Sequence, residues 1–240
     1  MVRLESILPK LHDSVRSGQA GTPPGRSPRT CRSHLPTGSK TDPRGAHRMN
    51  NVYFILRHGE SVPNTRGIIL SNLNEGEKEE YTLTPRGEEQ VGESVREAKE
   101  RALLDAGTII YSSPFSRCKR TAEIARDVLG VKTEIILDDR LRERWFGNWE
   151  GTSNENYQKV WDKDITGANH RDAGVESTGE IATRVSALIK DIEAAYFSKN
   201  ILLVSHGDAL QILQTVFENV PSSKHRGIEH FKVAEIRRIN

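Results

Sequence analysis

Short apolar runs alternate with amphipathic patterns from residue 52 to the C-terminus. Four runs rich in β-branched and aliphatic residues predict buried strands. They occupy residues 52–55, 108–111, 134–137 and 201–204. Apolar residues at helical spacing follow each of them, as in the stripe formed by Val91, Val95 and Ala98. Strands that alternate with helices predict an α/β fold with a mostly parallel sheet, and residues 232–238 fit one closing strand.

Several helix ends also carry recognisable signals. Thr84 and Pro85 fit an N-cap followed by the first helical residue, and Ser177 with Glu180 fits a capping box. The segment 64–81 contains a run of acidic residues, which is typical of a solvated loop. Residues 152–175 are polar and irregular, and loops of this kind often determine substrate choice.

Two of the predicted strands end in a similar way. The first continues into Arg57-His58-Gly59, and the fourth continues into Ser205-His206-Gly207. Ligands of open α/β sheets bind at the carboxyl ends of strands, so both imidazoles could meet at one sheet edge. Arg57 offers a charged fork suited to phosphate, and His58 offers a nitrogen nucleophile that can be neutral near pH 7. Gly59 permits a tight turn or close approach of a ligand. Arg-His-Gly alone is a weak motif, but its partial repetition favours a functional site.

Arg117 and Glu143 are further candidates. A helix predicted to start near Ser116 places Arg117 in its first turn, where backbone N–H groups favour an anion. An ordinary surface arginine is the alternative. Glu143 lies between Arg142 and Arg144, which would favour its ionised form if they point inward. A carboxyl beside a phosphoester can protonate the departing oxygen, although a surface ion pair is the simpler interpretation of Glu143.

These motifs, in this order, resemble those of the histidine phosphatase superfamily, also called phosphoglycerate-mutase-like. The resemblance extends from about residue 50 to the C-terminus. The matching residues are Arg57-His58-Gly59-Glu60, Asn64, Ser112–Ala122 around Arg117, Leu141-Arg142-Glu143, Gly147, Glu150-Gly151 and Ser205-His206-Gly207. Residues 69–71, 113–117 and 205–208 also resemble a little-characterised plant, algal and microbial branch.

The resemblance implies a fold and a mechanism. The fold would be a three-layer α/β sandwich with a mostly parallel central sheet, helices on both faces and a small inserted cap. The reaction would be cofactor-free, metal-independent hydrolysis of a phosphomonoester through a phosphohistidine. His58 would be the nucleophile and Glu143 the general acid, with Asp208 as the alternative acid. The phosphate would be held by Arg57, Asn64, Arg117 and His206. Pro63 replaces a tryptophan that often precedes the asparagine, which changes the local loop.

Two other functions compete with a phosphatase. Phosphoglycerate mutase-type transfer needs a closed site that keeps water from the phosphohistidine, and the segment after Gly151 looks shorter and less basic than in mutases. A phosphate-binding scaffold without turnover would not need a nucleophile and an acid together.

The composition divides the chain at residue 48. Residues 1–48 hold nine Lys and Arg against three Asp and Glu, and they are rich in Ser, Pro and Gly. This composition predicts a disordered extension or a transit peptide, and residues 49–240 the catalytic domain. We therefore expect a cytoplasmic protein, or a plastid or mitochondrial one if the extension is a transit peptide.

The remaining composition limits the expected partners. Residues 49–240 carry 26 basic and 30 acidic residues without an evident basic stripe, so we expect no nucleic acid partner. No apolar stretch is long enough to cross a membrane. Cys31 and Cys118 provide neither a disulfide framework nor metal-ligand spacing. The expected partner is a small phosphorylated metabolite, and the oligomeric state stays open.

Overall fold

The computed structural model describes residues 49–240, so the predictions for residues 1–48 lie outside the described residues. Its central sheet has the strand order β3-β2-β4-β1-β5. The strands are β1 (Val52–Arg57), β2 (Ile109–Ser112), β3 (Ile136–Leu137), β4 (Asn200–Ser205) and β5 (Ile236–Arg238). All neighbours run parallel except β5, which pairs antiparallel with β1. The mostly parallel sheet is therefore confirmed.

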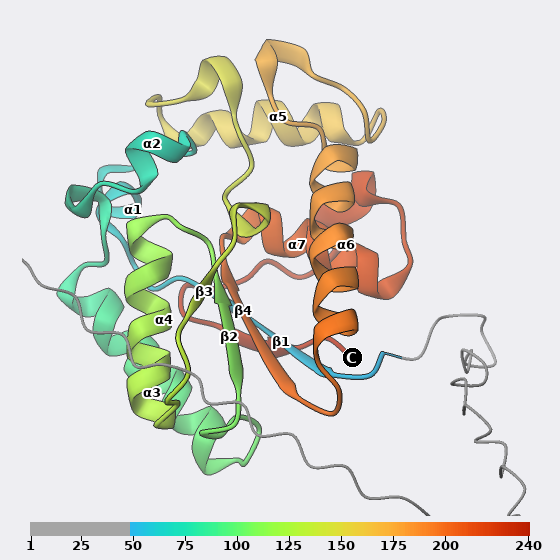
Figure 1. Cartoon of the computed structure of the whole chain (residues 1–240). Helices are drawn as coiled ribbons and strands as arrows, with labels where there is room; N and C mark the ends of the chain where they lie inside the picture. The colour runs from blue at the N-terminus through green and yellow to red at the C-terminus, as the bar shows by residue number, and fades with distance from the viewer. Residues whose placement is uncertain (1–48) are drawn as a thin grey trace, which may run out of the picture. The chain divides into compact units, whose positions relative to one another are not determined.

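Helices cover both faces of this sheet (Figure 1). On one face lie α3 (Pro85–Glu100) and α4 (Ser116–Leu129), and on the other lie α6 (Thr178–Ala195) and α7 (Gly207–Glu218). Successive residues of β1 point to opposite faces, as the strand geometry requires. Phe54 packs into the core beneath α3 and α4, whereas Tyr53 and Ile55 pack into the core beneath α6 and α7. The three-layer fold follows from these two cores.

The helix ends agree with the sequence signals. The Thr84 hydroxyl accepts a hydrogen bond from the Gly87 N–H at 3.0 Å, and Pro85 is the first residue of α3. Ser177 and Glu180 form the predicted capping box of α6. At Gly59 the close approach is made by the protein itself. A Cβ on Gly59 would lie 2.3 Å from the Gly87 carbonyl oxygen, so the glycine allows α3 to pack against the β1 turn.

The cap lies above the carboxyl ends of the strands and contains α5 (Tyr157–Asp164), as Figure 1 shows. A second chain segment joins it, with the short helices α1 (Val62–Arg66) and α2 (Leu73–Gly76). The Ile69 N–H donates to the Thr152 carbonyl at 2.9 Å and links the two parts. The segment 64–81, predicted to be a solvated loop, is therefore partly helical and belongs to the cap. The segment joins the cap through contacts with residues far away in the chain, such as Thr152, and the sequence pattern does not predict such contacts.

Short 3-10 turns complete the described chain. They span Glu79–Tyr81, Asp139–Leu141, Gly147–Trp149, Asn154–Asn156, Asp172–Gly174 and Ser222–Gly227. Gly147, with a φ of 56°, is needed for a close approach, because a Cβ there would lie 2.1 Å from the Ala173 carbonyl oxygen. This contact holds the chain just after Glu143 against the far end of the cap.

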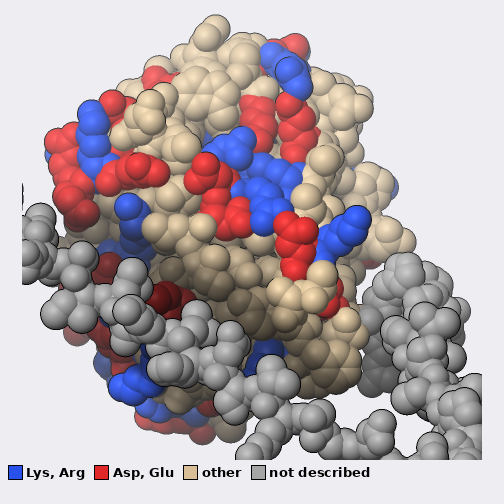
Figure 2. Space-filling view, in the orientation of Figure 1, with Lys and Arg blue, Asp and Glu red and all other residues tan. Residues whose placement is uncertain are grey.

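The described residues include no helix with both the length and the apolar character of a membrane span. Basic and acidic side chains are interspersed on the molecular face shown in Figure 2. Many charged side chains of the described residues are paired, as in the contacts of Arg140 with Asp191 at 2.6 Å and of Arg142 with Glu176 at 2.8 Å.

Candidate active site

The sheet brings the two His-Gly units together at one edge. Arg57 and Ser205 are register partners at the ends of β1 and β4, so the next residue of each strand is a histidine at the same level. The ring centroids of His58 and His206 lie 5.2 Å apart. The topology thus joins two motifs that are separated by more than half of the described chain.

The hydrogen bonds of His58 determine its tautomer. Nδ1 lies 2.8 Å from the Gly59 carbonyl oxygen, which can only accept, whereas Nε2 faces the donating Nε of Arg117 at 3.2 Å. The proton therefore resides on Nδ1, and Nε2 keeps its lone pair. Burial lowers the pKa of His58 well below its ordinary value, and the charges of Arg117 and Arg57 lower it further. His58 is consequently neutral, as a nitrogen nucleophile must be.

Arg117 lies between the two imidazoles. It is the second residue of α4, and its side chain is buried. Its Nε lies 3.2 Å from both His58 Nε2 and His206 Nδ1, while Nη2 donates to the Leu70 carbonyl oxygen at 3.0 Å. Nη1 is buried and has no partner among the described residues. Buried donors of this kind are normally satisfied, so Nη1 is suited to an anion.

Arg57 offers a second unsatisfied donor. Its Nη1 contacts the Phe231 carbonyl oxygen at 2.5 Å and His230 Nε2 at 3.1 Å, while its Nε is buried without a partner among residues 49–240. Arg57 and Arg117 both line one cavity of about 220 Å³. Two cationic side chains with unpartnered donors around one cavity are suited to bind an anion.

His206 occupies a different environment from His58. Its ring is fully buried, and it is not part of the cavity lining. Nδ1 accepts from Arg117, so Nε2 carries the proton and donates to the Ser113 hydroxyl at 2.9 Å. Burial lowers the pKa of His206 well below its ordinary value, with Arg117 adding to the effect. His206 therefore contacts the cavity through Arg117.

Glu143 lines the same cavity and is buried. Its Oε1 accepts from the backbone N–H of Arg144 at 2.9 Å, and Oε2 lies 3.9 Å from His206 Nδ1. Burial raises the pKa of Glu143 to about 7, with a contribution from the Asp208 charge that outweighs the opposing Arg117. A carboxyl with this pKa can both give and accept a proton near neutrality.

The arginines that flank Glu143 point elsewhere. The Arg142 guanidinium pairs with Glu176 at 2.8 Å. The Arg144 side chain is fully buried and forms a two-pronged ion pair with Asp164 at 2.7 and 2.8 Å. The condition under which the two side chains would favour ionised Glu143, that they point inward, is therefore not met, because each has a carboxylate partner of its own.

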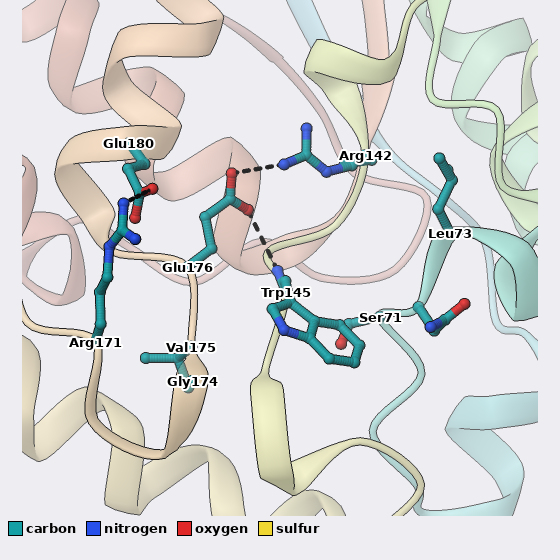
Figure 3. A pocket seen from close by; sticks show the side chains of 10 residues that line it. Ser71, Leu73, Arg142, Trp145, Arg171, Gly174, Val175, Glu176 and Glu180 are labelled. Carbon is teal, nitrogen blue, oxygen red and sulfur yellow. Dashed lines mark hydrogen bonds and ion pairs between the residues drawn. The ribbon is translucent and has the colours of Figure 1, made fainter.

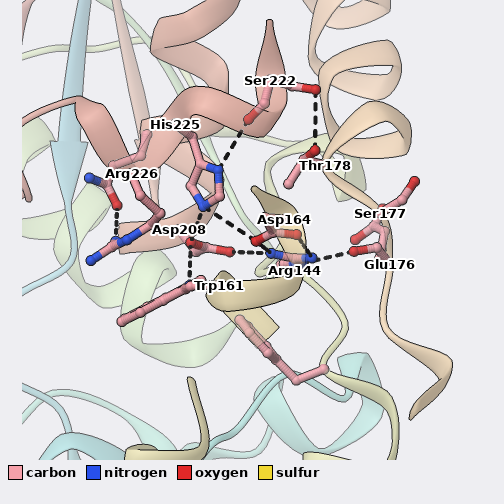
Figure 4. Close-up of polar contacts among 12 residues, drawn as sticks. Arg144, Trp161, Asp164, Glu176, Ser177, Thr178, Asp208, Ser222, His225 and Arg226 are labelled. Carbon is pink, nitrogen blue, oxygen red and sulfur yellow. Dashed lines mark hydrogen bonds and ion pairs between the residues drawn. The ribbon is translucent and has the colours of Figure 1, made fainter. Parts of the chain in front are cut away.

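Asp208, the alternative acid, accepts hydrogen bonds from Arg144 and Trp161 and lies close to His225 (Figure 4). Its carboxylate lies 3.2 Å from Arg144 Nη1, 3.0 Å from Trp161 Nε1 and 3.2 Å from His225 Nε2. Burial opposes ionisation, but His225 and Arg144 outweigh it and hold the pKa of Asp208 below its ordinary value. Asp208 stays ionised near neutral pH, which makes it unsuited to donate a proton.

Asn64 lies at the mouth of the cavity and is exposed. Its Oδ1 accepts from the Ser61 N–H at 3.1 Å and from the Ser61 hydroxyl at 2.8 Å, which caps α1. The carbonyl end of the side chain is thereby used, and the amide nitrogen remains available to donate.

The upper wall of the cavity comes from the cap and from the C-terminal segment. Tyr157 and Trp161 of α5 are stacked with ring centroids 5.4 Å apart and line the cavity. Asn154 and His230 line it as well, and no sequence signal pointed to them. His230 reaches the site only through its tertiary contact with Arg57.

A second, larger hollow of about 490 Å³ is lined by Ser71 and Arg142, the chain neighbours of Leu70 and Glu143 in the smaller cavity (Figure 3). It shares no lining residue with the smaller cavity. Its arginines are already paired, Arg142 with Glu176 and Arg171 with Glu180. The smaller cavity, with its unsatisfied donors and its unprotonated imidazole nitrogen, is therefore the better candidate for a catalytic site despite its size.

A family model described as "Histidine phosphatase superfamily (branch 1)" matches residues 53–240. The chain belongs to this superfamily. The predicted assignment to the histidine phosphatases is confirmed at this level, and the chain is an enzyme of the phosphatase type. The finer resemblance to a plant, algal and microbial branch stays a prediction.

Several relatives carry phosphatase or mutase names. The chain is 31% identical over 165 residues to "Putative phosphoserine phosphatase 2" of Hydrogenobacter thermophilus, covering 67% of this chain and 75% of the relative. It is 30% identical over 178 residues to "Probable phosphoglycerate mutase GpmB" of Escherichia coli, covering 72% and 77%.

Solved structures share the fold. A mycobacterial glucosyl-3-phosphoglycerate phosphatase in complex with VO3 superimposes with a TM-score of 0.64 at 23% identity, covering 78% of this chain and 91% of that one. A phosphoserine phosphatase variant of Entamoeba histolytica in complex with phosphoserine gives a TM-score of 0.61 at 24% identity, covering 78% and 88%. At these identities the likeness concerns the fold alone, and the expected three-layer architecture is confirmed.

Proposed function

We propose that the protein hydrolyses a small phosphomonoester through a phosphohistidine on His58, without a metal ion. The observation that carries this proposal is a neutral imidazole in the cavity lining, with the lone pair of Nε2 facing a buried guanidinium that has a free donor. A nucleophile and an anion site are thus adjacent.

In the first step, His58 Nε2 attacks the phosphorus atom in line, and the P–N bond forms as the ester P–O bond breaks. Arg57 and Arg117 bind the non-bridging oxygens through charge-assisted hydrogen bonds, and the Asn64 amide donates from the cavity mouth. The sequence suggested that His206 binds phosphate directly. Because it lies behind Arg117, we assign it the positioning of that guanidinium.

Glu143 serves as the acid and then as the base. Its carboxyl gives a proton to the departing oxygen in the first step. In the second step the carboxylate takes a proton from water, the water oxygen attacks phosphorus, and the P–N bond breaks to release inorganic phosphate. A pKa of about 7 suits both directions of this transfer.

Positive charge for the transition state would come from the two arginines, so no metal is required. Within residues 49–240, no cluster of His, Cys, Asp or Glu has an arrangement that could hold a metal ion. Phosphoglycerate mutase-type transfer and a binding scaffold without turnover are the competing hypotheses. Ionised Glu143 could activate water, which supports hydrolysis over return of the phosphoryl group to a product.

The direct test is rapid-quench labelling with a 4-nitrophenyl phosphate substrate, followed by mass spectrometry of acid-sensitive phosphopeptides. We expect the phosphoryl group on His58 and full activity after prolonged EDTA treatment. A label on His206, or no label in an active enzyme, would contradict the assignment. Activity that is lost with EDTA and restored by a divalent ion would contradict metal independence.

A further inference from the structure

The cationic residues of the cavity are few. Among the described residues, Arg57 and Arg117 are the only Lys or Arg side chains in the cavity lining. Their unsatisfied nitrogens are the donors that the proposed function assigns to the phosphate. A second anionic group on a substrate would therefore need another positive partner.

The groups near the cavity do not provide that partner. Burial lowers the pKa of His230, and the charges of Arg57 and Arg226 lower it further, so His230 is neutral near pH 7. Arg226 is outside the lining, and its guanidinium carbon lies 3.7 Å from the centre of the Trp161 ring while Nη1 donates to Gln211.

Arg144 is also unable to assist a ligand. Its side chain is fully buried and pairs with Asp164 and Asp208, contacts that Figure 4 shows. Asp208, the ionised carboxylate of the cavity lining, would repel a second anion, and Glu143 in its acid form offers no positive charge. An added carboxylate would thus lose its hydration without gaining a cation, which is unfavourable.

Neutral polar groups make up much of the remaining wall. The side chains of Asn154 and Tyr157 line the cavity and form no hydrogen bond to another described residue. Amide and phenol groups both donate and accept, which suits the hydroxyl groups of an alcohol. The volume of about 220 Å³ restricts the ligand to a small metabolite.

We infer that the substrate is the phosphate monoester of a small, uncharged, hydroxylated alcohol, and that the cavity discriminates against esters with a carboxylate or a second phosphate. This inference rests on the proposed function, because it assigns both arginines to one phosphoryl group. It differs from the chemistry in the names of the compared proteins, since phosphoserine and phosphoglycerate both carry a carboxylate.

Glycerol 3-phosphate and 3-phosphoglycerate provide a matched pair, because they differ in a CH2OH group against a carboxylate on the same carbon skeleton. Calorimetric binding to the full chain with His58→Ala measures the discrimination without turnover. We expect the affinity for glycerol 3-phosphate to exceed that for 3-phosphoglycerate by about tenfold or more. In the wild-type enzyme, kcat/KM should follow the same order. Equal affinities, or a preference for 3-phosphoglycerate, would overturn the inference.

A cation added to the wall should reverse part of the discrimination. In the His58→Ala background, Asn154→Lys should raise the affinity for 3-phosphoglycerate by roughly tenfold and change that for glycerol 3-phosphate much less. Asn154→Met controls for bulk. Gln158→Lys adds the same charge on the exposed face of α5, outside the lining, and should change neither affinity. If Asn154→Lys raises the affinity for both ligands equally, or if Gln158→Lys changes the affinities as much as Asn154→Lys does, the missing cation in the cavity wall is not the cause of the discrimination.

Failure of the proposed function would give a different result from failure of this inference. If no phosphohistidine forms but the two ligands are still discriminated, the phosphatase assignment fails and the neutral character of the wall stands. If phosphohistidine forms and the two ligands bind with equal affinity, the phosphatase assignment is correct and the inferred substrate class is wrong.

Discussion

The two strand-His-Gly units have similar sequences and end at the same edge of the sheet, yet their histidines differ. His58 follows β1 and is part of the cavity lining, with the lone pair of Nε2 facing Arg117. His206 follows β4 and lies behind Arg117, outside the cavity lining, where Nδ1 accepts from Arg117 and Nε2 donates to Ser113. The opposite tautomers follow from the neighbours, since His58 donates through Nδ1 and His206 through Nε2.

This difference shows that the strand-His-Gly motif determines where an imidazole lies in the fold. The neighbouring elements determine which of its ring nitrogens carries the proton. The Gly59 carbonyl oxygen accepts a hydrogen bond from His58 Nδ1, so Nε2 of His58 is unprotonated. In His206, Nε2 carries the proton and donates a hydrogen bond to the Ser113 hydroxyl. Replacing members of each unit should therefore have unequal consequences.

The largest effect should come from His58 itself. His58→Ala should lower kcat by roughly 10⁴-fold or more, because the nucleophile is lost, while His206→Ala should cost roughly 10²–10³-fold through a misplaced Arg117. Steady-state rates with 4-nitrophenyl phosphate, with circular dichroism as the control for folding, would measure both. If the two variants lose the same factor in kcat, or if folded His58→Ala still forms a phosphoenzyme, His58 and His206 do not have the different roles proposed here.

Glu143→Gln should separate substrates by their leaving groups. An alkoxide needs a proton to depart, so the loss should be roughly 10²–10⁴-fold for alkyl phosphates and much smaller for the phosphorylation step with an aryl phosphate. With the aryl ester we expect a burst of nitrophenol approaching one equivalent, because the attacking water lacks its base. If Glu143→Gln lowers the rate equally for both esters and shows no burst, Glu143 has a structural role and is not the acid.

The pH profile should reflect the raised pKa of Glu143. The acid form predominates below about pH 7, so kcat/KM for an alkyl phosphate should fall above that pH by about tenfold per unit. The lowered pKa of His58 keeps it neutral at pH values below the ordinary histidine range, so its acidic limb should lie below that range. The pH profile of Glu143→Gln should not show the decrease in kcat/KM above about pH 7. If the variant still shows this decrease, a group other than Glu143 causes it.

The smallest effect should come from Ser113, which supports only the second unit. Ser113→Ala leaves the buried N–H of His206 without its acceptor, and this should lower the free energy of unfolding by about 1–3 kcal/mol. Urea unfolding measures the change, and Ser112→Ala provides a control because the Ser112 hydroxyl bonds only to the neighbouring Ser113 carbonyl. A loss of turnover as large as that of His58→Ala would show that His206 takes part directly in the chemistry.

The sequence by itself determined the order of strands and helices and the sheet edge where the candidates lie. Apolar runs identified the strands, and Thr84 and Ser177 marked helix starts through local hydrogen bonds. The rule that parallel strands present their carboxyl ends at one edge then predicted that His58 and His206 could meet there. These inferences succeeded because each depends on neighbours in the chain or on general sheet topology.

Only the tertiary structure decided which groups contact one another at that edge. The ion pairs of Arg142 and Arg144, the contact of His230 with Arg57 and the second segment of the cap all join residues far apart in the sequence. The pKa of Glu143 depends on burial and on Asp208, which belongs to a different element. Protonation and contact arise from long-range packing, and a linear pattern does not specify which distant side chain will fill a given space.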